Sequence, residues 1–174
     1  ATDKITATVM SNIGLHKHLK EYGIGVDLTK VGDRYVLESM RETGSVLGGE
    51  QSGHMIFLNY TTTGDGVLSS LQFMKAYLDS GKKLSELRDE IQIYPQALVN
   101  ARVDNAFKAT ALEDEEVKKF IADIEAKMEG TGRVLIRPSG TEPLIRVMLE
   151  GEDIDEIQGY AKQVATLISD KFGK

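Results

Sequence analysis

The hydrophobic and polar residues of this chain follow two spacings in turn, one typical of strands and the other typical of helices. Apolar or β-branched runs of strand length stand at 5–10, 24–28, 45–49, 54–58, 97–103, 133–137 and 144–149. Helix-like spacing occurs at 13–19, 36–40, 67–78, 117–128 and 154–168, with a short helix expected at 84–91. This order predicts an α/β protein with a partly parallel sheet in its first half.

The pattern changes after residues 79–83, a polar and flexible segment that is followed by Pro95. From there the elements run strand, helix, strand, strand, helix. The change indicates two units, and the pattern alone fixes the boundary between them only loosely.

Composition excludes several classes of protein. At 174 residues and 19.1 kDa, with 41% hydrophobic and 28% charged residues, the chain is an ordinary globular protein of one medium or two small domains. The absence of cysteine excludes a disulfide scaffold and cysteine-based zinc or nucleophile chemistry, and it fits a cytoplasmic protein. A net charge of −6 without a lysine or arginine block argues against nucleic-acid binding. No run is long and apolar enough to cross a membrane.

A short loop, Pro138–Pro143, joins the last two predicted strands and offers mainly hydrogen-bond donors. Its two prolines stiffen the ends, and Gly140 lets the backbone turn tightly. The hydroxyls of Ser139 and Thr141, the backbone N–H groups and the guanidinium of Arg137 match the oxygens of a phosphate. In an isolated S-G-T turn, the Ser and Thr side chains usually form hydrogen bonds only within the turn. Here the flanking arginine and the paired prolines favour an anion site.

A second polar loop, Gly48–His54, separates the third and fourth predicted strands. Its glycines allow the backbone to approach a ligand closely. Glu50 and Ser52 bring a carboxylate and a hydroxyl side by side, a combination that can hold neighbouring hydroxyls of a sugar. The alternative interpretation is a polar turn at the end of a strand.

Both loops resemble motifs of one enzyme family. RPSGTEP before a strand resembles the phosphate-binding loop in the last domain of the α-D-phosphohexomutase superfamily, and GGEQSGH resembles that family's sugar-binding loop. The two variants are most similar to those of the bacterial phosphoglucosamine mutase branch. The resemblance covers almost the whole chain, but only as the C-terminal part of such an enzyme. Since the chain begins abruptly at Ala1, we expect a piece of a longer polypeptide.

The resemblance implies an α/β/α domain of the third-domain type at residues 1–90, incomplete at its start. A small α+β C-terminal domain is expected at residues 91–174. It further implies an isomerase that interconverts glucosamine 6-phosphate and glucosamine 1-phosphate, a reaction that supplies precursors of the bacterial cell wall.

The family's phosphoserine lies in its first domain, and the aspartates that hold Mg²⁺ lie in its second; neither motif is present here. We therefore expect the magnesium ligands outside this chain, and we expect the chain alone to be inactive. The expected partners are a sugar phosphate and the N-terminal domains of the same protein, without nucleic acid or membrane. A homodimer is left open.

The resemblance also assigns roles to residues of the two loops. It implies that Glu50 and Ser52 contact hexose hydroxyls, that Gln51 faces the amino-sugar side and that His54 lines the site. The residues expected to hold the phosphate that does not react are Arg137, Ser139, Gly140 and Thr141. Holding that phosphate positions the reacting end of the sugar.

Further residues are expected to line the substrate cleft, namely Lys30, Asp33, Arg34 and Arg146. For the first three, a solvated charged loop is an equally good explanation. No metal site is expected, because His16 and His18 do not share a helix face and have no third ligand nearby. Asp65 is a lone carboxylate and is interpreted as a helix N-cap rather than as a magnesium ligand.

Three other interpretations remain open. A dimerisation or scaffold domain would bind no sugar phosphate. A phosphomannomutase or phosphoglucomutase relative would carry a sugar loop that differs only subtly. A sugar-phosphate-binding module without catalysis would need only the two loops.

Overall fold

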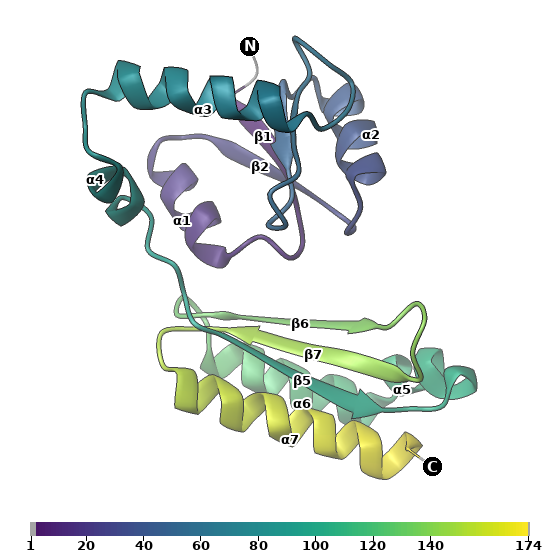
Figure 1. Ribbon diagram of the computed structural model, residues 1–174. Helices are drawn as coiled ribbons and strands as arrows, with labels where there is room; N and C mark the ends of the chain where they lie inside the picture. The colour runs from purple at the N-terminus through teal and green to yellow at the C-terminus, as the bar shows by residue number, and fades with distance from the viewer. Residues whose placement is uncertain (1–2, 174) are drawn as a thin grey trace. The chain divides into compact units, whose positions relative to one another are not determined.

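The computed structural model describes residues 3–173, which form two compact units that adjoin in the sequence at Ile93 and Tyr94 (Figure 1). The N-terminal unit contains a four-stranded sheet in the order β2-β1-β3-β4. Its strands are β1 (Lys4–Thr8), β2 (Gly25–Thr29), β3 (Leu47–Gly49) and β4 (Met55–Phe57). β1 is parallel to β2 and to β3, whereas β4 is antiparallel to β3. The partly parallel sheet confirms the α/β prediction.

Two crossover helices connect the parallel strands of this unit. The chain passes from β1 to β2 through α1 (Ile13–Glu21) and returns from β2 to β3 through α2 (Asp33–Thr43). Because parallel crossovers keep one hand, helices that advance in opposite directions along the sheet cover opposite faces of it. Figure 1 shows α1 and α2 on opposite sides of β1. Asn12 caps α1, since its side chain accepts a hydrogen bond from the Gly14 N–H.

The packing of α2 on the sheet depends on a glycine in β3. Val36, Met40 and Ile56 form the buried core on this face. A Cβ at Gly48 would lie 2.5 Å from the Met40 sulfur and 2.8 Å from Val36 Cγ1. Only a glycine therefore lets α2 approach β3 this closely, and this contact anchors the strand that leads into the 48–54 loop.

The long helix α3 (Gly66–Ser80) forms as predicted, and it is followed by α4 (Leu84–Asp89). The apolar stripe of α3, however, is not a core face in this structure. Val67, Leu71 and Leu78 are 74%, 63% and 70% exposed, and the helix buries none of its residues. The apolar spacing predicts the helix correctly, but within residues 3–173 the apolar side of α3 does not pack on another apolar surface.

The C-terminal unit has a three-stranded antiparallel sheet in the order β5-β7-β6. Its strands are β5 (Gln96–Arg102), β6 (Arg133–Pro138) and β7 (Leu144–Glu150), and its helices are α5 (Lys108–Glu113), α6 (Glu115–Lys127) and α7 (Ile154–Phe172). A 3-10 turn at Asn105–Phe107 precedes α5, and the sequence pattern did not predict either element. The mixed composition of helices and antiparallel strands confirms the expected α+β fold.

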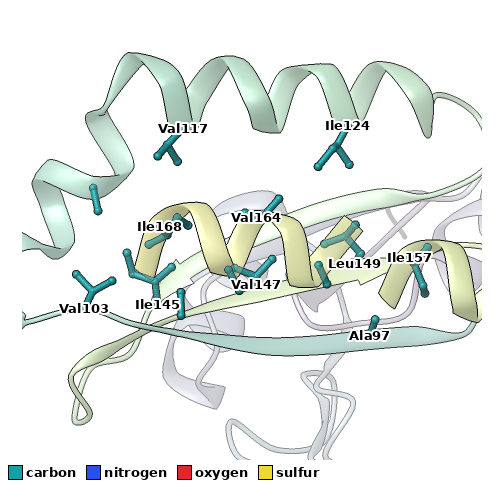
Figure 2. Packing of buried hydrophobic residues seen from close by; sticks show 14 of the residues in the cluster. Ala97, Val103, Val117, Ile124, Ile145, Val147, Leu149, Ile157, Val164 and Ile168 are labelled. Carbon is teal, nitrogen blue, oxygen red and sulfur yellow. The ribbon is translucent and has the colours of Figure 1, made fainter. Parts of the chain in front are cut away.

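One face of this sheet carries the core (Figure 2). Figure 2 shows residues of α6 and α7, among them Val117, Ile124 and Val164, pointing toward Val147 and Leu149 of the central strand. Ile157, Val164 and Ile168 are almost completely buried, which confirms the predicted stripe of the last helix. The helices do not cover the opposite face of the sheet. On that face, paired side chains of the three strands form rows across the sheet, and two of these rows contain charged residues.

The rows follow from the strand register. Arg133, Glu150 and Gln96 are paired at one end of the sheet, and Arg137, Arg146 and Asn100 are paired near the other end. In the first row, Glu150 is fully buried, and its carboxylate accepts hydrogen bonds from Arg133 Nε and Gln96 Nε2. This row is a closed structural network, whereas the second row lies beside the 138–143 loop.

Candidate functional site

The 138–143 loop joins β6 to β7 and is folded back on itself. The Ser139 N–H donates to the Leu144 carbonyl at 2.9 Å, and the Glu142 N–H donates to Ser139 Oγ at 3.2 Å. Ser139 is 5% exposed, whereas Gly140 and Thr141 are exposed. The loop therefore has a fixed base and an open tip.

The tip presents donors that have no protein acceptor. Within residues 3–173, the N–H groups of Gly140 and Thr141 and the Thr141 hydroxyl make no hydrogen bond. A Cβ added at Gly140 would meet nothing within 4 Å, so open space surrounds this part of the backbone. Adjacent free N–H groups in a turn form a concave site that suits an anion.

Two arginines stand beside this loop at directly paired positions, Arg137 on β6 and Arg146 on β7. Paired residues of antiparallel strands have Cβ atoms about 5 Å apart, where like charges destabilise the sheet. Arg146 Nη2 donates to Glu142 Oε2 at 2.9 Å, but its buried Nε has no partner. Arg137 is half-buried and makes no ion pair within the described residues. The pair leaves positive charge unbalanced next to the free N–H groups.

The structure thus brings together Arg137, Ser139, Gly140, Thr141 and Arg146 in one strand–loop–strand segment. Two further residues lie beside this segment and were not predicted from the sequence. Asn100 is exposed on the same cross-strand row as Arg146. Lys108 of α5 donates to the carbonyls of Ser139 and Glu142 at 2.6 and 2.5 Å. No local motif marks either residue, because each meets the loop only through the fold.

The 48–54 loop connects β3 to β4 as a tight hairpin. The Glu50 N–H donates to the His54 carbonyl at 2.9 Å, and the Gly53 N–H donates to the Glu50 carbonyl at 3.0 Å. Gly53 has a φ of +92°, a backbone conformation that residues with a side chain rarely adopt. The turn leaves Gln51 and Ser52 exposed, and their side chains make no hydrogen bond within residues 3–173.

The side chain of Glu50 ties this loop to the start of α2. Its Oε1 accepts a hydrogen bond from the Gly32 N–H at 2.8 Å. Gly32 is the residue before α2 and has a φ of +130°. One carboxylate oxygen of Glu50 is therefore engaged in fixing the loop, and its other oxygen is available to a ligand hydroxyl.

His54 lies between the start of α2 and the segment that leads into α3. Its Nε2 is 3.5 Å from Asp33 Oδ2, and its ring fills the space where a side chain at Gly64 would stand. The Asp33 and Gly64 contacts fix His54 at the edge of a hollow of about 420 Å³ that Ser52, Asp65 and Ser69 also line. The volume is within the range of small-molecule sites.

The two remaining charged candidates of this unit make weaker cases. Arg34 Nε donates to Glu38 Oε1 at 2.9 Å, an exposed pair one helical turn apart. Lys30 is exposed, and its side chain makes no bond within the described residues. The geometry therefore ranks these two residues behind Glu50, Ser52 and His54.

In the described part of the chain, no three His, Asp or Glu residues gather as metal ligands. Asp65 Oδ1 accepts from the Leu68 N–H at 2.9 Å, which confirms its interpretation as the N-cap of α3. No helix between residues 3 and 173 is long and apolar enough to cross a membrane.

Family models match both units. Residues 1–94 match phosphoglucomutase/phosphomannomutase, alpha/beta/alpha domain III, and residues 98–167 match the C-terminal domain of the same family. Phosphoglucosamine mutases of Alkaliphilus metalliredigens and Caldicellulosiruptor saccharolyticus are 58% and 56% identical to the chain over 97% of its length. The chain spans 38% and 37% of these two relatives.

Solved structures agree with the fold. A crystal structure of Aspergillus fumigatus N-acetylphosphoglucosamine mutase in complex with GlcNAc-6P and magnesium matches 96% of the chain with a TM-score of 0.78 and 17% identity, and the match covers 38% of that structure. The expected α/β/α domain followed by a small C-terminal domain is confirmed. The chain belongs to the phosphoglucomutase/phosphomannomutase family and carries its domain III and its C-terminal domain.

Proposed function

We propose that this chain is the sugar-phosphate-binding part of a bacterial phosphoglucosamine mutase, a cytoplasmic isomerase that interconverts glucosamine 6-phosphate and glucosamine 1-phosphate. The observation that carries the proposal is the pairing of Arg137 with Arg146 beside the free N–H groups of Gly140 and Thr141. Two cations and two N–H donors around an open turn need an acidic ligand with several oxygens. A phosphate monoester has three such oxygens and a charge near −2.

In this proposal the 138–143 loop binds the phosphate that is not transferred. Arg137 supplies charge and paired donors, because its guanidinium has no competing carboxylate. Arg146 adds a second guanidinium, which Glu142 holds in place through its carboxylate. The hydroxyls of Ser139 and Thr141 complete the set of donors. Binding a remote phosphate positions the rest of the substrate and lowers the entropy that must be lost at the reacting end.

The 48–54 loop is proposed to bind the hexose. Ser52 and the second oxygen of Glu50 face sugar hydroxyls, Gln51 faces the amino group, and His54 lines the site. The magnesium ion of the whole enzyme would neutralise charge on the transferring phosphoryl group. In this proposal its ligands and the phosphoserine belong to parts of the enzyme outside this chain.

Titration of the isotope-labelled chain with glucosamine 6-phosphate, followed by amide NMR, tests the proposal. Inorganic phosphate and free glucosamine are the matched ligand controls. We expect saturable shifts at Gly140 and Thr141 with both phosphates, and shifts at 48–54 only with ligands that contain the sugar. Arg137→Ala should weaken phosphate binding by about tenfold or more, the scale of a lost charge-assisted hydrogen bond. Arg41→Ala removes an exposed arginine without a partner in the described residues and should leave binding unchanged.

The alternatives give different results in the same experiment. A preference for glucose or mannose phosphates over glucosamine 6-phosphate would identify a relative with another substrate. Isomerase activity of the longer protein that contains this chain, with no activity of this chain alone, would distinguish an enzyme part from a binding module. No shifts at millimolar concentrations of either phosphate would refute the proposed site.

A further inference from the structure

Lys108 lies outside both loops, yet its ammonium group donates hydrogen bonds to the backbone of the 138–143 loop. Lys108 is the first residue of α5 and is half-buried. Its Nζ donates to the Ser139 carbonyl at 2.6 Å and to the Glu142 carbonyl at 2.5 Å. These acceptors are 31 and 34 residues away in the sequence, so the contact is tertiary.

The geometry points to Lys108 as a positioning residue that holds the 138–143 loop in its anion-binding conformation, an inference that rests on the proposed function. The Ser139 carbonyl and the Gly140 N–H belong to one peptide group. In a trans peptide these two bonds point to opposite sides. When Lys108 holds the carbonyl on its own side, the Gly140 N–H is turned to the other side, where it has no protein acceptor.

The second bond of Lys108 fixes the far end of the same turn. The Glu142 carbonyl also accepts from the Leu144 N–H at 2.8 Å, and the next residue is Pro143, which has no N–H. The two carbonyls held by Lys108 therefore bracket Gly140 and Thr141, the residues whose N–H groups are free. A loop held at both ends loses less conformational freedom when it binds its ligand.

The remaining contacts of the loop do not replace this one. Ser139 Oγ and the Glu142 carboxylate lie 3.5 Å apart, and Arg146 holds the same carboxylate. These bonds, together with those of the Ser139 and Glu142 N–H groups, fix the base of the loop. Lys108 alone among the described side chains donates to the Ser139 carbonyl. Loss of Lys108 should free this peptide to rotate and should leave the sheet intact.

The test compares phosphate binding by the 174-residue chain with that of Lys108→Met, Lys108→Arg and Lys119→Met, with inorganic phosphate as the probe. Lys119 is exposed on α6 without a partner in the described residues, so its substitution removes the same charge without touching the loop. Dissociation constants come from the shifts of Gly140 and Thr141, and the amide spectrum of α7 shows whether each variant is folded. We expect Lys108→Met to weaken binding about tenfold, the scale of one charge-assisted hydrogen bond. Lys119→Met should bind like wild type, and Lys108→Arg should recover part of the loss.

Salt separates positioning from simple attraction between charges. A long-range attraction is screened at high ionic strength, where the Debye length falls to a few ångströms, about 3 Å at 1 M. The ratio of the Lys108→Met and wild-type dissociation constants should therefore persist at high salt, and the ¹³C shifts of the Ser139 and Glu142 carbonyls should change in the free variant.

Three results would overturn the inference. These are equal binding by Lys108→Met and wild type, a ratio that falls to one at high salt, and unchanged carbonyl shifts. If the wild-type chain itself bound no phosphate, the proposed function would fail first, and this outcome is distinguishable because it does not depend on Lys108.

Discussion

Arg137 and Arg146 occupy directly opposed positions on β6 and β7, and only Arg146 has a carboxylate partner in the described chain. Two cations at such positions repel each other, so a free protein gains nothing from keeping both. A dianion bound between the two guanidinium groups, at the base of the donor-rich loop, would neutralise this repulsion. The pair therefore predicts opposite effects on stability and on binding.

Arg137→Met tests this opposition directly. Methionine keeps most of the apolar stem and removes the charge, so the variant should raise the free energy of unfolding by a few tenths to about 1 kcal/mol in buffers without phosphate. Wild type should gain stability when phosphate is added, because a ligand that binds only the native state stabilises it. The variant should gain little, so the order of stability reverses. Urea unfolding with and without phosphate measures both values, and a variant less stable than wild type without phosphate would contradict the prediction.

Arg133 is the contrasting case on the same face of the sheet. Its partner Glu150 is fully buried, and Arg133 itself is only 20% exposed in its side chain. Arg133→Met should destabilise the chain by about 3 kcal/mol, because it leaves a buried carboxylate without its cation. Combining it with Glu150→Gln should recover much of the loss, since the amide carries no charge. A double mutant that is destabilised by the sum of both single effects would show that the two residues are not coupled.

Gly48 controls how closely α2 packs on β3. Gly48→Ala should destabilise the N-terminal unit by about 1–3 kcal/mol, because the new methyl group would lie 2.5 Å from the Met40 sulfur. Gly66→Ala is the matched control, since a Cβ there meets nothing within 4 Å and the residue has no positive φ. Thermal melts of the two variants measure the difference. Equal melting temperatures would mean that α2 shifts without cost.

Elements with strong local signals could be predicted from the sequence. The stripe of α7 and the hydrogen bond from the Leu68 N–H to Asp65 are set by residues three or four positions apart, and the structure has both. The family of the chain also followed from two contiguous motifs. In each case the determining residues are neighbours in the sequence.

Features that depend on distant contacts could not be predicted in this way. The position of Lys108 next to the Ser139 carbonyl arises from the tertiary fold, in which α5 packs against α6 and α7, and no spacing in the sequence records it. The exposure of Leu71 and Leu78 is of the same kind. An apolar stripe predicts that a helix has one hydrophobic face, but it does not tell which surface that face meets.

Asp114 gives the chain a specific pH dependence. Its carboxylate accepts a hydrogen bond from Lys171 at 2.6 Å and caps α6 by accepting from the Val117 N–H at 3.0 Å. The Lys171 bond, followed by the backbone bond, lowers the pKa of Asp114 from its ordinary value. The charged form is thus favoured in the folded state, so this contribution to stability is fully present above the unfolded-state pKa of about 3.9. It is lost as the pH falls through the lower folded-state pKa.

Comparison with Asp114→Asn isolates this effect, because asparagine still caps a helix but cannot attract Lys171. The free energy of unfolding of wild type should exceed that of the variant by a constant amount from pH 7 down to about pH 5, since Asp114 is ionised in both states over that range. Below about pH 5 the difference should shrink, while the titration of the other carboxylates cancels between the two proteins. Urea unfolding across this range measures it. A difference that stays constant at acidic pH, or one that grows, would show that the ion pair with Lys171 does not contribute to stability in solution.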